Sequence, residues 1–292
     1  MCDIAGKFEE WRDQLCGGDV HSVQQQIFRM MWNAAVFNLV RKARELALHD
    51  GEGEVQHNWA VSEFILTGYF ETQSLGIRRL LDPRRDVVSL KRLVTDLEKA
   101  VHLLTRRNIL AAAECPYDYE EVIEGPDHHG VSGPELAKTA FSEEMHARID
   151  SLTGVEATAR SPDDKVRPEV IKRLKCRLNQ CDEIYTYVTK FFAHAATQDS
   201  RDKKNADEIK LTLRKISEVH RILCENTAFI AKSILGLPFD QFLVLYTRDV
   251  FENLTAPMAS EETVPQLREE WESYERTTRE WANWTSCDEV AK

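Results

Sequence analysis

The run VQQQIFRMMWNAAVFNLVRKARELAL, residues 23–48, decides the fold class. Its apolar residues recur every three or four positions, the period of one face of an α-helix: Val23, Ile27, Met30, Met31, Ala34, Phe37, Ala43 and Leu46. The following HDGEG, residues 49–53, ends the run with a glycine stop. The stretch therefore predicts one long amphipathic helix.

The same periodicity predicts four further long helices, at about 59–81, 90–112, 167–196 and 203–235. Pro83 follows the first of these and ends it, because proline lacks a backbone donor and clashes with the preceding turn. Ser89 stands where the next helix needs an N-cap. Short connections between the early helices favour an up-and-down bundle, and the last two helices are expected to form an antiparallel pair.

Residues from about 115 to 166 differ in composition, with several prolines and glycines and one short helical patch near 135–152. We interpret them as a long insertion or crossover within a helical bundle domain of residues 1–237. A C-terminal helical extension, 238–292, holds a predicted helix near 240–254 and an acidic tail with tryptophans. The expected fold is thus all-α: an up-and-down helical bundle with a long inserted loop and this extension.

Composition excludes several classes of protein. Only 12 glycines and 9 prolines occur in 292 residues, which disfavours a turn-rich all-β fold, and the net charge of −11 disfavours indiscriminate nucleic-acid binding. Seven cysteines without a CxxC pair fit a reduced, cytoplasmic chain. The N-terminus lacks a secretion signal, and no apolar run is long enough for a membrane span.

The charge is unevenly distributed. Residues 73–108 hold nine basic and four acidic side chains, and residues 160–180 hold seven and three. Residues 260–292 reverse this balance, with nine acidic and four basic side chains. A local basic face inside an acidic protein remains compatible with RNA binding, although solvated helix surfaces explain the same counts.

Familiar catalytic motifs are absent: no phosphate-binding GxxxxGK[ST] loop, no GxGxxG, no GxSxG and no HExxH occurs. Cys115, His128 and His129 lack paired-ligand spacing, so we expect no metal and no cofactor.

The informative segment is YVTKFFAHA, residues 187–195. On a helix Lys190 and His194 share a face, where a histidine can transfer protons and a cation can stabilise phosphate charge. That pair suits RNA cleavage by the RNA's own 2′-hydroxyl, which needs no metal.

Three motifs in order carry a family resemblance: SLGIRRLLDP (residues 74–83), SLKRL (residues 89–93) and the later Ala193-His194. As a set they resemble the HEPN superfamily, and more narrowly its AbiU-like branch, which is linked to bacterial abortive infection. The resemblance covers about residues 23–237, the insertion excluded. It implies a helical bundle that forms a homodimer, in which two histidines meet at the subunit interface and make one composite ribonuclease site.

The resemblance assigns His194 as the catalytic residue and Lys190 as a phosphate ligand. The family's motif also has an arginine that four to six intervening residues separate from the histidine, but Tyr187, Val188 and Thr189 hold those positions here. Lys190 lacks the bidentate guanidinium fork, so Arg201, Arg177 or the pair Arg78 and Arg79 would have to supply the cation. Arg78 and Arg79, with Asp82, can instead serve to hold a helix end to its turn.

Three functions remain open on the sequence. The first is a metal-independent endoribonuclease of toxin or anti-phage type. The second is a catalytically inactive HEPN-like module that binds RNA or a regulatory protein partner. The third is an interaction protein whose acidic tail, with Trp271, Trp281 and Trp284, docks on a basic partner; the same tryptophans also fit a last amphipathic helix packed on its own bundle. No membrane partner is expected.

Overall fold

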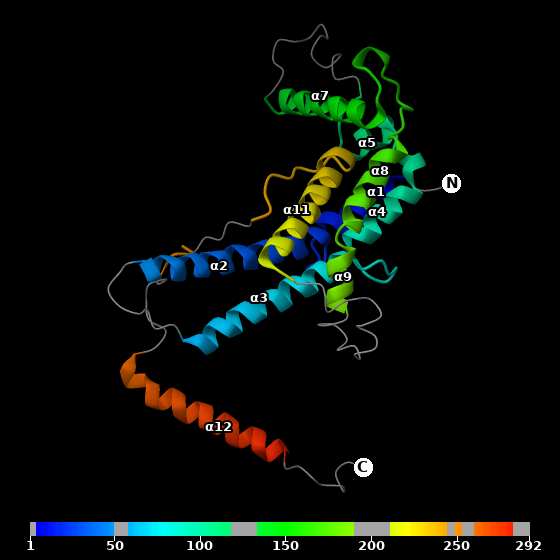
Figure 1. Cartoon of the computed structure of the whole chain (residues 1–292). Helices are drawn as coiled ribbons and strands as arrows, with labels where there is room; N and C mark the ends of the chain where they lie inside the picture. The colour runs from blue at the N-terminus through cyan, green and yellow to red at the C-terminus, as the bar shows by residue number, and fades with distance from the viewer. Residues whose placement is uncertain are drawn as a thin grey trace, which may run out of the picture. The chain divides into compact units, whose positions relative to one another are not determined.

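The computed structural model describes residues 4–49, 58–117, 133–189, 211–243, 249–252 and 260–282. Within these ranges every regular element is a helix, and the one extended pairing is an isolated antiparallel bridge between Thr105 and Lys165 (Figure 1). The predicted all-α fold class is confirmed.

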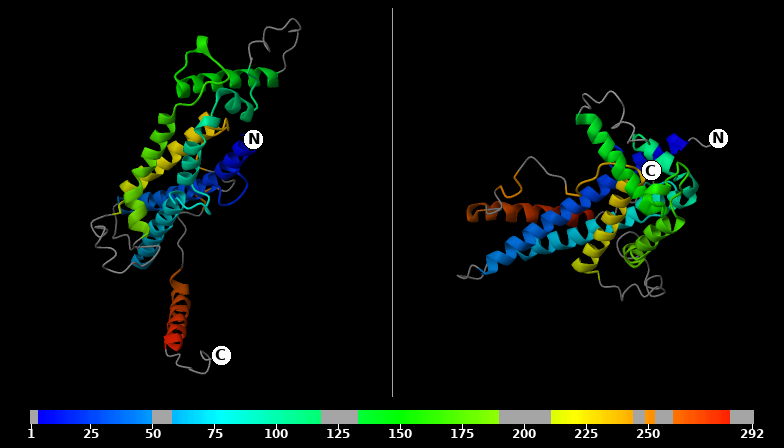
Figure 2. Two further views of the ribbon diagram at one scale, coloured as in Figure 1. Left: turned by 90° about the vertical axis from the view of Figure 1, so that its right-hand side faces the viewer. Right: turned by 90° about the horizontal axis from the view of Figure 1, so that it is seen from above.

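Two long helices, α2 (Val23–His49) and α3 (Trp59–Leu80), have nearly the predicted bounds. They lie side by side in Figures 1 and 2 and make a helical hairpin. Gly76 permits their close approach, because a Cβ at this position would lie 2.7 Å from the sulfur of Met30. The apolar period of α2 therefore finds its partner in the next helix along the chain.

The next predicted helix is divided, which corrects the expectation of one helix over 90–112. The segment forms α4 (Leu90–Lys99), a 3₁₀ turn η1 (Val101–Leu103) and α5 (Arg106–Ala112). Ser89 caps α4 as predicted. The side chain of Thr105 caps α5 and starts a new helix, so the chain changes direction between the two.

The expected inserted loop contains a full helix. The helical patch predicted near 135–152 is confirmed as α7 (Gly133–Thr153), which runs for 21 residues. Its Met145 and Ile149 are completely buried in the common core, so this part of the chain completes the bundle rather than decorating it. A 3₁₀ turn η2 (Ala157–Ala159) lies in the return segment that follows.

The predicted helix over 167–196 is also divided. Its described part consists of α8 (Pro168–Asn179) and α9 (Asp182–Val188), separated at Gln180 and Cys181. The backbone N–H of Cys181 bonds to the carbonyl of Leu178, three residues back, and this tight turn interrupts the α-helical ladder.

The last long helix of the bundle, α11 (Leu213–Phe229), continues as a π-helical turn η5 (Ile230–Ile234). It was expected to start near residue 203, but residues 203–210 lie outside the described ranges. α11 runs antiparallel to α8 and α9, as predicted, since Lys215 near its start pairs with Glu183 of α9, whereas Asn226, further along, donates to the carbonyl of Leu174 in α8.

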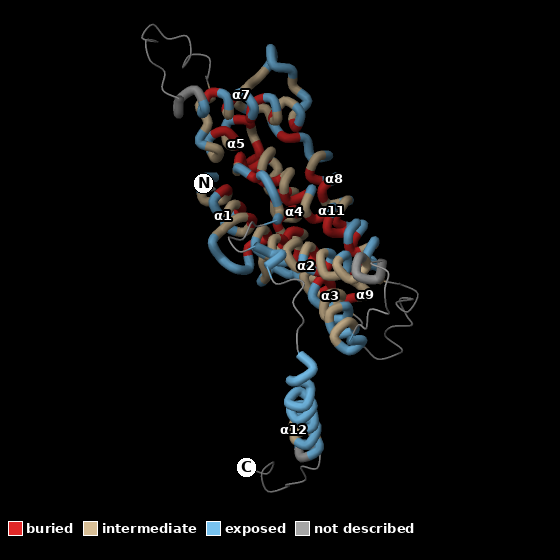
Figure 3. Tube along the Cα trace, turned by 90° about the vertical axis from the view of Figure 1, so that its left-hand side faces the viewer, coloured by how far each residue is buried: buried red, intermediate tan, exposed pale blue. Residues whose placement is uncertain are grey.

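The first helix, α1 (Ile4–Cys16), has no counterpart in the sequence analysis. It buries Phe8, Trp11 and Leu15, and its Arg12 donates to the carbonyl of Leu235 at 2.9 Å. Figure 3 shows the buried residues concentrated where α1, α4, α5, α8 and α11 meet.

Gly236 follows η5 with a φ of +60°, a conformation that L side chains rarely adopt. A Cβ here would lie 2.3 Å from the Cβ of Ala113 at the end of α5. The turn after η5 therefore needs a glycine both for its backbone angle and for space.

The chain divides into two compact units, Met1–Val244 and Leu245–Lys292, whereas the sequence analysis sets the boundary after residue 237. The predicted helix over 240–254 is wrong for its described part, because residues 240–243 and 249–252 contain no helix. The second unit contains a 3₁₀ turn η6 (Glu261–Thr263) and α12 (Val264–Ala282).

Candidate functional site

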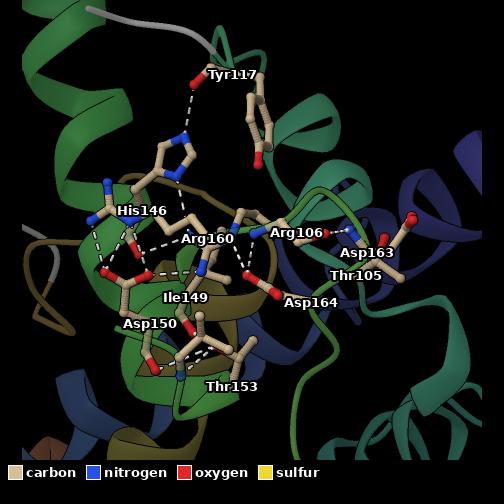
Figure 4. Close-up of polar contacts among 12 residues, drawn as sticks. Thr105, Arg106, Tyr117, His146, Ile149, Asp150, Thr153, Arg160, Asp163 and Asp164 are labelled. Atoms are coloured by element: carbon tan, nitrogen blue, oxygen red, sulfur yellow. Dashed lines mark hydrogen bonds and ion pairs between the residues drawn. The ribbon is translucent and has the colours of Figure 1, made fainter. Parts of the chain in front are cut away.

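A completely buried arginine joins α5 to α7 and to the return segment (Figure 4). The Nη2 atom of Arg106 lies 2.7 Å from Oδ1 of Asp150, and its Nε atom lies 2.9 Å from Oδ2 of Asp164. A buried cation is stable only when it is paired in this way. Arg106 therefore holds these segments together and is not available to a ligand, although it is one of the nine basic residues of the stretch 73–108.

His146 completes this cluster as a neutral side chain. Nη1 of Arg106 lies 3.1 Å from Nδ1 of His146, and a guanidinium can only donate, so Nδ1 accepts. The proton then resides on Nε2, which lies 3.0 Å from the carbonyl of Tyr117 and donates to it. Burial and the charges of Arg106 and Arg160 lower the pKa of His146. Both ring nitrogens are occupied, so this histidine does not shuttle protons.

Arg160 provides a second cation, with Nη2 at 2.7 Å and Nε at 3.1 Å from the two oxygens of Asp150. Burial by itself would raise the pKa of Asp150, but hydrogen bonds from Arg160 and Arg106 outweigh it and lower this pKa. We call Arg106, His146, Asp150, Arg160 and Asp164 the Arg106 network. Its two arginines balance its two carboxylates.

The Arg106 network fixes the return segment that carries the next arginine. The backbone N–H of Arg106 donates to Asp164 at 2.8 Å, and Val166 donates to Leu104 at 3.0 Å. Arg167 follows, and its side chain donates to two carbonyls in the last turn of α7, those of Ser151 at 3.1 Å and Leu152 at 3.3 Å. A cation there also complements the negative end of the helix dipole.

Beside Arg167 lies a groove with a volume of about 640 Å³. The C-terminal end of α7, one face of α8 and the second half of α11 enclose it. Its apolar lining comes from Leu152, Val170, Leu174 and Phe229, and its charged lining comes from Arg167, Arg173, Arg177, Arg221 and Glu225. We call it the arginine groove.

The arginine groove is short of negative charge. Glu225 accepts from both Arg177 and Arg221, the latter with Nη1 at 3.2 Å from Oε2. Arg173 is exposed and has no carboxylate partner among the described residues, and Arg167 donates to backbone carbonyls. Four guanidinium groups thus surround one carboxylate, an arrangement that attracts anions such as phosphate.

The candidate residues from the sequence are not all in one place. Arg177 lines the arginine groove, whereas Arg78 and Arg79 do not and lie in the last turn of α3. Burial raises the pKa of Asp82 after this turn, but hydrogen bonds from Arg84 and the charge of Arg78 lower it overall. Arg78 and Arg79 therefore lie at the C-terminal end of α3, close to Asp82, and not in the arginine groove.

His194, Lys190 and Arg201 lie outside the described residues, so their positions relative to the arginine groove are open. The sequence analysis missed three groove residues, Arg167, Arg173 and Arg221. The first two belong to the basic stretch 160–180, which was the available signal. Arg221 lies four residues before Glu225 and looks like an ordinary helix-surface ion pair on the sequence.

Other reactive side chains offer no alternative centre in the described part of the chain. Burial raises the pKa of Cys181 and of Cys224 to about 12, which keeps both thiols protonated. Three or more His, Cys, Asp or Glu side chains grouped to hold a metal ion are not found among the described residues. No described helix has both the length and the apolar character of a membrane span.

Comparison with known proteins identifies no relative: no family model, no curated protein and no solved structure matches the chain.

Proposed function

We propose that the protein binds RNA in the arginine groove and acts as a HEPN-like, metal-independent endoribonuclease of bacterial defence or toxin type. The observation that carries the proposal is the excess of guanidinium groups over carboxylates in one groove. RNA suits this groove because its phosphates bind arginine forks while the apolar lining accommodates sugar and base surfaces.

The proposed chemistry uses His194 as the proton-transferring group at a homodimer interface, with Lys190 as a phosphate ligand. The ribose 2′-hydroxyl would attack the adjacent phosphate, His194 would take the hydroxyl proton, and the departing 5′-oxygen would leave with a proton from the second histidine. Arg177 is our candidate for the missing family arginine, because it already belongs to a groove with excess positive charge.

RNA binding is tested by fluorescence anisotropy with a labelled single-stranded RNA of about 20 nucleotides. Replacing Arg173 and Arg221 together by alanine should weaken binding about tenfold and flatten the salt dependence, because two phosphate contacts are lost. The matched control replaces Arg107 and Arg214, two exposed arginines outside the groove, by alanine. Equal losses in both double variants would refute a specific groove.

Cleavage is tested by incubating cellular RNA with the protein in the presence of EDTA. The wild type should cut, His194→Ala should not, and Arg177→Ala should cut more slowly. Intact RNA with the wild type, or equal cutting by His194→Ala, contradicts the ribonuclease proposal centred on His194.

A second candidate function, a non-catalytic HEPN-like module that binds RNA, is favoured by one observation. Tyr187, Val188 and Thr189 occupy the positions of the family's arginine. This candidate predicts binding that depends on Arg173 and Arg221 without any cleavage, so the two experiments together separate the candidates. Expression adds a check, because an active ribonuclease toxin should stop growth and its His194→Ala variant should not.

A further inference from the structure

The helix α12 carries an apolar stripe with a heptad period. Five apolar or aromatic residues and one polar residue, Thr278, are separated alternately by three and four positions, which are the a and d positions of a coiled coil: Val264, Leu267, Trp271, Tyr274, Thr278 and Trp281. The opposite face is polar and mostly charged. Such a stripe over 19 residues is the pattern of a helix that pairs with another helix.

The stripe has no cover within its own unit. Trp271 is 74% exposed and Trp281 is 64% exposed, and α12 is exposed along most of its length (Figure 3). Apart from the short turn η6, no other regular element of this unit is described that could pack on α12. Large aromatic side chains on one helix face are characteristic of an interaction surface.

We propose that α12 pairs with α12 of a second copy of the chain, in the antiparallel direction. In an antiparallel pair each a residue meets a d residue of the other helix. Val264 then lies in one layer with the partner's Trp281, and Leu267 with the partner's Thr278. The two central layers each combine Trp271 with the partner's Tyr274. Every outer layer thus joins one larger and one smaller side chain, as close packing requires.

The flanking charges select the same direction. In the antiparallel register Arg268, at an e position, lies beside the partner's Glu275, and the twofold axis repeats this pair. In a parallel pair, Glu270 at a g position would instead face the partner's Glu275, and like charges would repel twice. Within one helix Arg268 and Glu275 are two turns apart, and Glu275 pairs with Arg279. Glu272 lies four residues after Arg268, but no ion pair of Arg268 is formed within the described part of its own chain, so its guanidinium group is available to the partner's Glu275.

The pairing depends on α12 alone and does not rest on the proposed RNA binding. About two and a half heptads give a weak helix pair, so the dimer should form and dissociate with concentration. The site of contact also differs from the His194 interface of the proposed function. A chain with both contacts would have two separable ways of self-association.

Sedimentation of the full chain tests the interface between about 1 and about 100 µM. We expect the average mass to rise at least twofold over this range, from the mass of one chain or, where the His194 interface also forms, from the mass of that dimer. Replacing Trp271 and Tyr274 together by alanine should weaken dimerisation more than tenfold, about the loss of two aromatic layers. The matched control replaces Glu269 and Arg276, on the outer face of α12, by alanine and should sediment like the wild type.

A mixing experiment tests the direction. Arg268→Glu and Glu275→Arg should each dimerise about tenfold more weakly than wild type, because each homodimer then has two like-charged pairs. A mixture of the two variants should recover dimers, because every pair across the antiparallel heterodimer is again of opposite charge. Arg276→Glu serves as the charge control, because it reverses a charge on the outer face of α12, away from the proposed interface, and should dimerise like the wild type.

Three results would overturn the proposal: an average mass that does not rise with concentration, a rise that is insensitive to the Trp271 and Tyr274 double variant, or no recovery in the mixture. A monomer in which Trp271 and Trp281 are shielded from an added quencher would mean that α12 is covered by its own chain, and one in which both are accessible would mean a different partner. RNA titration of the double variant keeps the two proposals apart, because binding in the arginine groove should persist in a chain that no longer pairs through α12.

Discussion

The Arg106 network and the arginine groove use the same side chain in opposite ways. In the network, two arginines share two carboxylates and a neutral histidine, and Arg106 has no exposed surface. In the groove, four arginines surround one carboxylate, Glu225, which pairs with only Arg177 and Arg221, and their side chains reach solvent. The ratio of cations to carboxylates, together with burial, separates an arginine that holds the fold from one that is available to a ligand.

The largest expected effect is on the network. Arg106→Leu leaves Asp164 without its buried cation and removes the donor to His146, so the free energy of unfolding should fall by about 3–5 kcal/mol. Urea denaturation measures this loss. Arg107→Leu is the control, because this neighbouring side chain is 65% exposed and its removal should change stability by about 0.5 kcal/mol or less. Similar losses for both variants would mean that the network does not stabilise the fold.

Acid should destabilise the fold through its two buried histidines, His220 and His146. Burial lowers the pKa of His220 to about 4, and its Nε2 atom has no hydrogen-bond partner. The unfolded chain has a histidine pKa of about 6.5, so the folded state prefers the neutral ring. This contribution to stability is complete above about pH 6.5 and is lost as the pH falls through 6.5 toward 4. His146 has a lowered pKa as well and loses stability in the same direction.

The His220→Leu variant should therefore resist acid. Between pH 7.5 and pH 5 the wild type should lose about 2 kcal/mol more unfolding free energy than this variant. Denaturation curves at the two pH values measure the difference. RNA binding by the folded protein should change little, because the arginines of the groove stay charged throughout. A variant as acid-sensitive as the wild type would show that His220 is not the responsible group.

The smallest effect concerns the groove's own carboxylate. Glu225→Gln removes the one negative charge that Arg177 and Arg221 share, so RNA affinity should rise about threefold while stability falls slightly. Glu218→Gln is the control, because this exposed residue pairs with Arg214 on the same helix outside the groove. Anisotropy titrations compare the two. Unchanged or weaker binding by Glu225→Gln would contradict an electrostatic role for the groove.

The first half of the fold was predictable because its signals are local. The apolar period of α2, the proline after α3 and the cap at Ser89 all act within a few residues. The break before α5 was not predictable in this way, because the apolar period continues through it. Arg106 turns inward for partners at Asp150 and Asp164, which are far along the chain, and single-segment patterns contain no information about them.

The candidate site follows the same rule. Arg177 was found because the stretch 160–180 is basic in composition. Arg221 reaches the groove only because α11 packs antiparallel on α8, and Arg167 only because the Arg106 network fixes the segment before it. The sequence also does not distinguish the buried Arg106 from the exposed Arg107, since both have the same local composition.

The glycine after η5 has a consequence for recognising distant relatives. Gly236 has a φ of +60° and no room for a Cβ beside Ala113, so any substitution there is opposed twice. Apolar core positions can exchange among Leu, Ile and Met as sequences diverge, whereas position 236 does not tolerate the replacement of its glycine. We therefore expect a glycine at this position, C-terminal to the paired Arg106 and Asp150, in other chains of this architecture. It could serve to align them even where their overall sequence identity is low.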